Sequence, residues 1–224
     1  MNLLKTRMII KSGRKDSRGI TLVELIISIV IVSIMVLTVY GIYTYSHSQV
    51  LNAERRTKVQ NELAFAMEHM SKYVEQSSGD TLNPPIKAYP DPDTQTGFQV
   101  RVDFNSTQTP SDLTDDAWVS YSLASATHTL STACTPEASG TCGSFVNEVL
   151  TDKIIANFVS GVMPNNPTNG FYVSIDPSGN IVEVGLVGRF KPSESPATAS
   201  ERLINPQLEL KAKMLSNSAS APLP

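Results

Sequence analysis

The residue types and motifs from which catalytic sites are commonly built are scarce or absent in these 224 residues. The chain has three histidines and two cysteines, and it contains no GxSxG elbow, HExxH helix or phosphate-binding loop. His47 ends an apolar segment, His69 lies on a predicted helix and His128 lies in a predicted strand, so no catalytic constellation emerges. We therefore expect no enzyme activity, no small-molecule substrate and no cofactor.

Proline is absent between Ile20 and Asn83, and charge is almost absent from Ile20 to Ile42, where Glu24 is the only charged residue. The first absence removes the strongest helix breaker. The second leaves 23 residues, or about 34 Å of helix, which is enough to cross the core of a bilayer. A lone carboxylate inside such a segment costs up to about 2.5–3.5 kcal/mol near the centre. Glu24 therefore needs a partner that the segment itself does not supply.

A basic leader precedes the apolar segment and ends at Arg18-Gly19. It carries six cations and one anion, a net charge of +5, which keeps this end cytoplasmic by the positive-inside tendency and sends the C-terminal bulk across the membrane. An ordinary secretory signal fits less well. The apolar run is longer than an h-region of about 7–15 residues, and no small-x-small cleavage site closes it.

The run Arg18-Gly19-Ile20-Thr21-Leu22-Val23-Glu24 resembles the processing signal of type IV prepilins and type II secretion pseudopilins. The resemblance implies that a prepilin peptidase cuts after Gly19 and that the new N-terminus on Ile20, where the family usually has Phe, is N-methylated. It also implies that Glu24 neutralises the Ile20 amine of a neighbouring subunit in a filament. The alternative is an ordinary single-pass anchor in which Gly19 and Glu24 have no special role.

Loss of the leader would take the net charge from −3 to −8, because six cations and one anion leave with it. This acidic balance argues against nucleic-acid binding. The local basic clusters are Arg55-Arg56 and the pair Lys211 and Lys213, which we interpret as solvated surface.

Cys134 and Cys142 bracket a short loop that contains proline and glycine. Two cysteines close in sequence on an exported segment predict a disulfide. Closing so short a loop would contribute about 2–3 kcal/mol. Their spacing is not that of a metal site. A cation remains a hypothesis at two acidic segments, Asp91–Gly97 and the group Asp112, Asp115 and Asp116, and a solvated acidic surface is the simpler interpretation of each.

Hydrophobic periodicity predicts a helix from Thr21 to Ser77, followed by strands and loops. The predicted strands cover residues 98–104, 118–123, 171–175, 181–190 and 208–214, with a hairpin turn at 176–180. Residues 153–162 fit a buried strand or a short helix, and Pro192–Pro206 fits a mobile loop. The outcome is an α+β fold in which a long helix packs on an antiparallel sheet. This pilin-like architecture is what the resemblance also implies.

We expect four parts: a leader removed at 1–19, a transmembrane or filament-core helix at 20–45, its amphipathic continuation at 46–77, and a periplasmic or extracellular β-rich domain at 78–224. Within the family, Asn61–Met70, Val182–Leu186 and the strand introduced by Asn205-Pro206-Gln207 look most like the minor pilin W and pseudopilin J subgroups.

Three functions follow from these expectations. The first is a minor pilin that starts assembly or sits near a pilus tip, with other minor pilins and a major pilin as partners. The second is a J-type pseudopilin of a type II secretion system. In both, the subunit waits in the inner membrane and then moves to a pilus or pseudopilus. The third is a membrane-anchored periplasmic binding domain or adhesin that never enters a filament.

Overall fold

The computed structural model describes residues 20–80, 82–89, 97–105, 112–155, 170–194, 201 and 204–217. The chain divides into two compact units, Met1–Ser48 and Gln49–Pro224. One helix, α1 (Leu22–Glu75), contributes residues to both units. Its bounds confirm the helix predicted from the absence of proline. Ser77 helps to end it, because its amide and its hydroxyl both donate to the carbonyl oxygen of Val74, at 3.2 and 2.6 Å.

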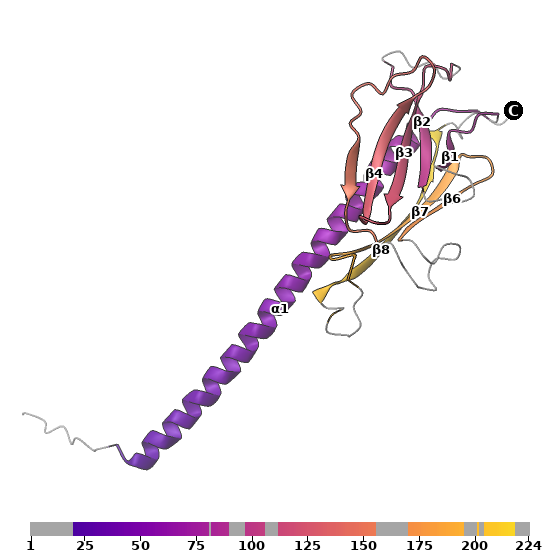
Figure 1. Ribbon diagram of the computed structural model, residues 1–224. Coiled ribbons are helices and arrows are strands. Elements are labelled where there is room, and N and C mark those ends of the chain that lie inside the picture. Colours follow the sequence, from indigo (N-terminus) through magenta and orange to yellow (C-terminus); the bar gives the residue numbers. More distant parts are fainter. Residues whose placement is uncertain are drawn as a thin grey trace, which may run out of the picture. The chain divides into compact units, whose positions relative to one another are not determined.

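Within the described residues, the second unit adds eight strands to the last turns of α1 (Figure 1). Their bounds are β1 Ile86–Tyr89, β2 Gly97–Val102, β3 Ala117–Ala124, β4 Thr129–Pro136, β5 Glu148–Thr151, β6 Phe171–Ile175, β7 Ile181–Arg189 and β8 Gln207–Leu215. They form a five-stranded sheet in the order β1-β2-β3-β4-β5 and a three-stranded sheet in the order β6-β7-β8, with antiparallel pairing throughout. The α+β prediction is confirmed.

The predicted hairpin is formed by β6 and β7, with Ile175 opposite Val182. Its turn begins at Asp176, whose carboxylate accepts from the amide and hydroxyl of Ser178. Gly179 has a φ of +68°, a conformation that glycine adopts without strain. The turn chemistry visible in the sequence therefore sets the register of this sheet.

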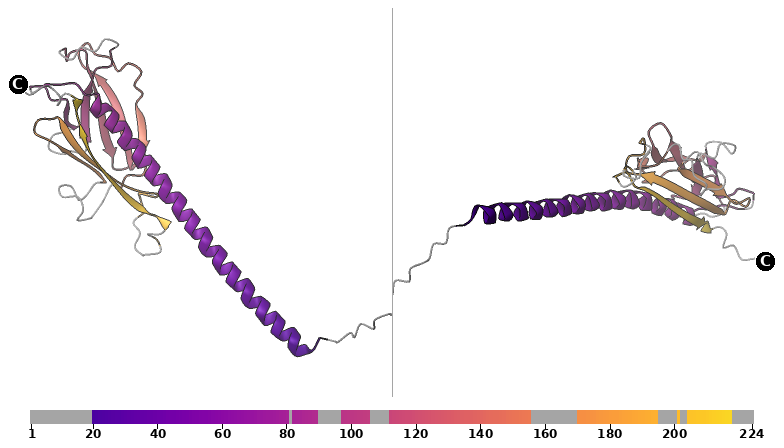
Figure 2. Two further views of the ribbon diagram at one scale, coloured as in Figure 1. Left: turned by 180° about the vertical axis from the view of Figure 1, so that it is seen from behind. Right: turned by 90° about the horizontal axis from the view of Figure 1, so that it is seen from below.

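The core of the second unit is built from side chains of the last turns of α1 and of both sheets. Both turned views show these turns running alongside the strands (Figure 2). The helix contributes a stripe of buried residues at three- and four-residue steps: Val59, Leu63, Ala66, Met67, Met70 and Val74. The sheets contribute mainly aromatic and β-branched side chains, among them Phe98, Val100, Tyr121, Phe171 and Val184. This is the amphipathic half of α1 that the sequence pattern predicts.

Three segments differ from the sequence-based expectations or meet them only in part. His128 does not lie in a strand but in the turn between β3 and β4, with a φ of 59°. Residues 153–155 are extended, since Ile154 forms a bridge with Gly188, whereas residues 156–162 lie outside the described residues. The same holds for 195–200 and 202–203 of the predicted mobile loop. At its described end, the buried Asn205 side chain bonds the Lys191 amide and carbonyl.

Candidate functional site

The N-terminal end of α1 holds Glu24 in a compact hydrogen-bonded arrangement. The carbonyl oxygen of Thr21 accepts the first helical bond, from the Leu25 amide at 3.1 Å, so Thr21 is the N-cap residue. The Thr21 hydroxyl oxygen accepts from the Glu24 amide at 3.2 Å. In return, the Glu24 Oε2 atom accepts from the amide of Thr21 at 2.9 Å and from its hydroxyl at 3.0 Å. This is a capping box, in which two residues satisfy each other's polar groups.

The capping box corrects the interpretation that the segment supplies no partner for Glu24. Thr21 supplies one, and the carboxylate also lies in the first turn, where the helix dipole favours negative charge. The signal was present in the sequence, because threonine followed three residues later by glutamate is the capping-box spacing. Both donors reach Oε2, and among the described residues no hydrogen bond reaches Oε1. One carboxylate oxygen is therefore open to a further donor.

The remaining polar side chains between Ile20 and Val39 are also satisfied within the helix. The hydroxyls of Ser28, Ser33 and Thr38 each donate to the carbonyl oxygen four residues earlier, at 2.7–2.8 Å. A polar group in hydrocarbon must find its partner within the protein, because no water is present there. With Thr21 and Glu24 paired to each other, every polar side chain of this stretch has such a partner.

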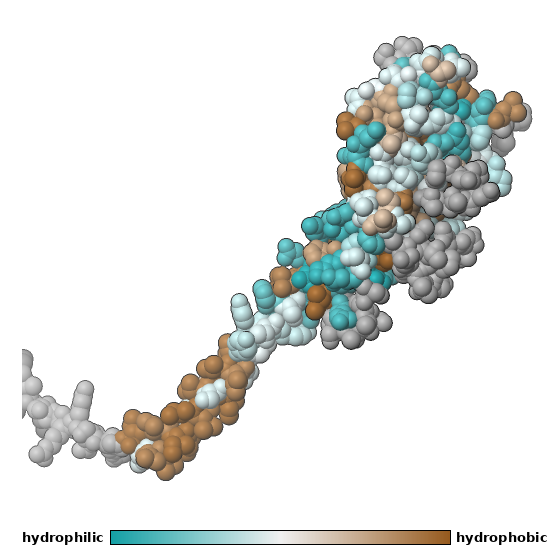
Figure 3. Space-filling view, in the orientation of Figure 1, coloured by the Kyte–Doolittle hydropathy of each residue, from teal (hydrophilic) through white to brown (hydrophobic). Residues whose placement is uncertain are grey.

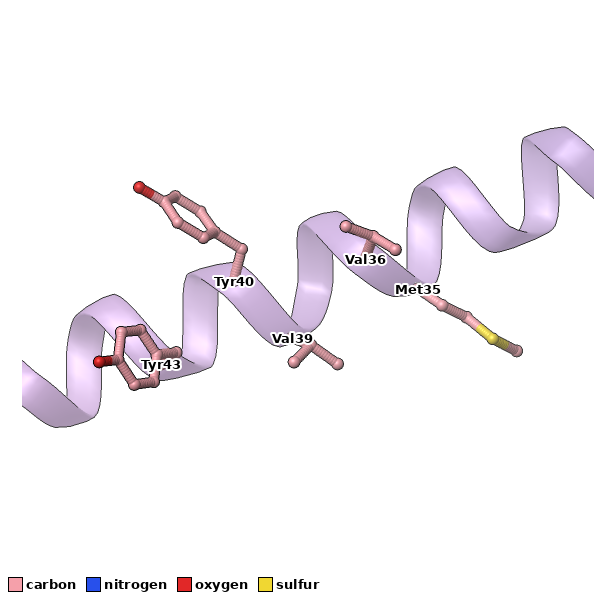
Figure 4. A pocket seen from close by; sticks show the side chains of 5 residues that line it. All are labelled: Met35, Val36, Val39, Tyr40 and Tyr43. Carbon is pink, nitrogen blue, oxygen red and sulfur yellow. The ribbon is translucent and has the colours of Figure 1, made fainter.

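Apolar side chains cover this stretch on all sides. From Ile20 to Tyr45 the large apolar side chains are between 48% and 76% exposed. On the face shown in the space-filling view, hydrophobic residues predominate over the N-terminal part of this stretch and give way to paler, less hydrophobic residues toward its end (Figure 3). By length and composition, α1 can cross a membrane, and its position near the N-terminus fits a single-pass anchor. A shallow apolar groove also runs along this stretch, lined by Met35, Val36, Val39, Tyr40 and Tyr43 (Figure 4).

Of the predicted processing residues, Ile20 is the first described residue and is 76% exposed, whereas Gly19 lies outside the described residues. In the uncut chain the nitrogen of Ile20 belongs to a peptide bond. The ammonium group that would pair with Glu24 therefore exists only after cleavage.

In the second unit, the sulfur atoms of Cys134 and Cys142 lie 2.06 Å apart, at disulfide distance. Cys134 belongs to β4, and the loop closed by the pair packs against the residues that precede β3. The Glu137 amide donates to the Asp116 carbonyl oxygen at 2.9 Å, and the Ser139 amide donates to that of Thr114 at 3.0 Å. The cysteine pair thus closes a loop that is also held by hydrogen bonds to the residues before β3.

An acidic cluster lies beside this segment, but its members differ from those proposed from the sequence. Asp103, Asp115 and Asp116 each place a carboxylate oxygen within 4.8 Å of the other two. Asp112 is not a member, because its carboxylate accepts from the amide and hydroxyl of Thr114. Asp103 joins because the β2–β3 pairing sets Val102 opposite Ala117. Residues 90–96 of the other acidic segment lie outside the described residues.

Burial dominates the electrostatics of Asp116, which is 1% exposed. Desolvation, together with the like charges of Asp103 and Asp115, raises the pKa of its carboxyl group, while the Ser78 hydroxyl and the Arg101 guanidinium partly offset the effect. Arg101 is itself buried and stacks 4.6 Å from the Trp118 ring. These groups form the polar end of the five-stranded sheet.

His69 lies among aromatic rings. Its Nδ1 atom is 3.1 Å from the Tyr121 hydroxyl, its Nε2 atom is 3.6 Å from a Glu148 carboxylate oxygen, and Phe65, Tyr73 and Phe145 pack around the ring. Desolvation lowers the pKa of this histidine. The arrangement ties α1 to β3 and β5, which is a structural contribution.

The N-terminal end of α1 lies within a segment that matches a known family model. Residues 14–40 match the family model of the prokaryotic N-terminal methylation motif. No curated protein and no solved structure matches the chain. The likeness therefore rests on the segment that contains Gly19, Ile20, Thr21 and Glu24, and this segment supports a type IV prepilin-like family.

Proposed function

We propose that the chain is a minor type IV pilin, a structural subunit that starts filament assembly or sits near the tip of a pilus. A prepilin peptidase removes residues 1–19, and residues 20–45 hold the subunit in the inner membrane before assembly. The domain that follows the helix lies in the periplasm and then on the cell surface. The methylation motif over residues 14–40 and the internally satisfied apolar helix support this proposal.

The observation that carries the proposal is the capping box at the cleavage site. In the membrane, the Thr21 amide and hydroxyl stabilise the Glu24 carboxylate at Oε2. In a filament core from which water is excluded, an ammonium group on a neighbouring Ile20 is costly unless it is paired. The open Oε1 atom of Glu24 can accept from that ammonium group without loss of the Thr21 bonds. Such charge-assisted bonds are about twice as strong as neutral ones.

Filament incorporation of Glu24 variants tests this role. In the native host, Glu24→Ala should leave the tagged chain in the membrane but lower its amount in sheared filaments. Glu54→Ala is the matched control, because Glu54 is an exposed glutamate on the same helix beyond the apolar stretch. Equal incorporation of Glu24→Ala and Glu54→Ala would refute the role of Glu24 in assembly.

The partners recovered with the chain after mild crosslinking separate the two filament functions. Other minor pilins would support the pilus, whereas pseudopilins of a secretion system would assign the chain to the J-type function. The same N-terminal motif serves both machines, so only the neighbours distinguish them. Recovery of the chain with its leader intact and without filament partners would leave a membrane-anchored binding domain.

A further inference from the structure

Three tyrosines mark the end of the apolar stretch. Tyr40, Tyr43 and Tyr45 are each 66% exposed, and the next charged residue along the chain after Glu24 is Glu54. The stretch before them, residues 20–39, would be about 30 Å long as a helix, which equals the thickness of a bilayer hydrocarbon core. The tyrosines therefore begin where hydrocarbon would give way to lipid headgroups.

The rings do not share one face of α1. At 3.6 residues per turn, Tyr43 projects roughly 60° from Tyr40 in one direction around the helix axis. Tyr45 projects roughly 140° from Tyr40 in the opposite direction. A second helix would cover one face only, whereas a lipid headgroup layer surrounds the helix. The phenol ring is amphipathic, with an apolar body and a polar hydroxyl, and such rings are enriched at membrane interfaces.

The apolar groove on this stretch of α1 extends as far as the tyrosines. Met35, Val36 and Val39 line its N-terminal part, and Tyr40 and Tyr43 line its C-terminal end (Figure 4). One turn further, the Tyr43 ring stacks on His47 with the ring centroids 6.1 Å apart. The surface thus changes from aliphatic to aromatic and then to polar within about three turns.

We infer that Tyr40, Tyr43 and Tyr45 form an anchor in the lipid headgroup layer that fixes the depth of α1 in the membrane. This inference rests on the proposed membrane stage of the subunit. With the tyrosines at one interface, the start of the helix reaches the opposite one, and Glu24 lies about 6 Å inside it, in the first turn. There a capped carboxylate is less costly than at the bilayer centre, and the bond after Gly19 is accessible to a peptidase at the cytoplasmic face.

Depth measurements on the full chain in phosphatidylethanolamine and phosphatidylglycerol vesicles test the anchor. A nitroxide label at Ser33 or Ser46 reports depth by its accessibility to oxygen and to a water-soluble nickel chelate. In the unsubstituted chain, we expect the label at 33 to be accessible to oxygen and the label at 46 to the chelate. The triple change Tyr40→Ala, Tyr43→Ala and Tyr45→Ala should shift both labels by about one turn, roughly 5 Å.

Two further variants keep this test decisive. The triple change Val36→Ala, Val39→Ala and Ile42→Ala removes a similar number of apolar side chains and should leave the depth unchanged. Replacement of the three tyrosines by tryptophan should also preserve it, because tryptophan shares the interfacial preference. An unchanged depth in the tyrosine-to-alanine variant would overturn the anchor. So would protection of the label at 46 from both reagents, since a second helix would then cover the rings.

The same samples distinguish failure of the anchor from failure of the membrane proposal. A chain that inserts at another depth stays with the vesicles after an alkaline wash, and only the anchor is then wrong. A chain that the wash removes does not span the bilayer, and that result would overturn both the anchor and the membrane stage of the proposed function.

Discussion

Two stretches of α1 share a backbone conformation but differ in what surrounds their apolar side chains. Within residues 22–45 every large apolar side chain is exposed, whereas the stripe from Val59 to Val74 is buried against the sheets. The first stretch is apolar on all sides, and the second is apolar on one side only. The chain therefore supplies a hydrophobic core for the second stretch, whereas the apolar side chains of the first stretch must be covered by something other than this domain.

Polar groups show the same division. In the first stretch they are satisfied by the helix itself, through the Thr21–Glu24 capping box and the hydroxyl bonds of Ser28 and Ser33. In the second stretch they reach other elements: Glu62 accepts from Thr151 of β5, and His69 contacts Tyr121 of β3. Bonds made within the helix stay in place when its surroundings change, which fits the proposed passage from membrane to filament, whereas the bonds of the second stretch require the folded domain.

The largest effect expected from this comparison is on the free energy of unfolding of the second unit. Leu63→Ala should lower it by about 2–5 kcal/mol, because Leu63 is fully buried and truncation leaves a cavity. Ile31→Ala, in the exposed stretch, should change it by less than about 0.5 kcal/mol. Urea unfolding of the full chain in micelles, followed by Trp118 fluorescence, measures both. Equal losses would mean that the two stretches are not in different environments.

Membrane insertion should be sensitive to substitutions in the first stretch and insensitive to those in the second. Ile31→Lys places a charge in the middle of the apolar stretch and should cost about 2.5–3.5 kcal/mol of insertion free energy. The control Gln60→Lys adds the same charge at an exposed position of the second stretch and should have no effect. The measured quantity is the fraction of chain retained in alkaline-washed membranes. Full retention of Ile31→Lys would contradict the assignment of this stretch to the bilayer.

Loss of the Cys134–Cys142 link should affect only the second unit. The double change Cys134→Ala and Cys142→Ala should lower its unfolding free energy by about 2–3 kcal/mol through the greater freedom of the unfolded loop. Membrane retention should be unchanged. Urea unfolding with and without reductant checks this, because the reductant should destabilise the unsubstituted chain and leave the double variant unaffected. A reductant effect of the same size in both would show that the link contributes nothing.

The smallest expected effect concerns Asp116. Because the pKa of its carboxyl group is raised in the folded unit, ionisation of Asp116 lowers the free energy of unfolding. The loss begins as the pH rises through the ordinary aspartate range, and it is complete above the raised pKa. Asp116→Asn should therefore raise the unfolding free energy of the unit at neutral pH, by less than the disulfide contributes, and lose this advantage in acid.

Asp112→Asn is the control for Asp116 and should act with the opposite sign. The Thr114 hydroxyl and amide lower the pKa of the Asp112 carboxyl group, so its charged form stabilises the folded unit above the ordinary aspartate range and ceases to do so in acid. Unfolding curves at a series of pH values measure both variants. A gain from Asp116→Asn that persists at low pH would contradict the account.

Much of this division can be predicted from the sequence, because it depends on local patterns. The proline-free run sets the length of α1, continuous and periodic apolar residues distinguish its two stretches, and the Asp176–Asn180 turn predicts the β6–β7 hairpin. The capping box is equally local, since Thr21 and Glu24 have the required spacing, although the partner that it gives Glu24 is a neutral residue and not a charged one.

What the sequence did not predict depends on contacts between distant segments. Strands β1 and β5 have four residues each, and β4 is rich in small and polar residues, so none of the three carries a clear alternating pattern. Asp103 joins the acidic cluster only through the β2–β3 register. His69 meets Tyr121 and Glu148 only because the sheet folds onto the helix. Such pairings are properties of the tertiary fold.

The mass of the N-terminal peptide, determined on chain purified from the membranes and filaments of its native host, tests the central claim most directly. We expect a peptide that begins at Ile20 and carries one additional methyl group on its amine, because the methylation motif covers this position. A peptide that begins at Met1 or elsewhere in the leader would contradict processing after Gly19, and with it the pairing of Glu24 with a neighbouring N-terminus.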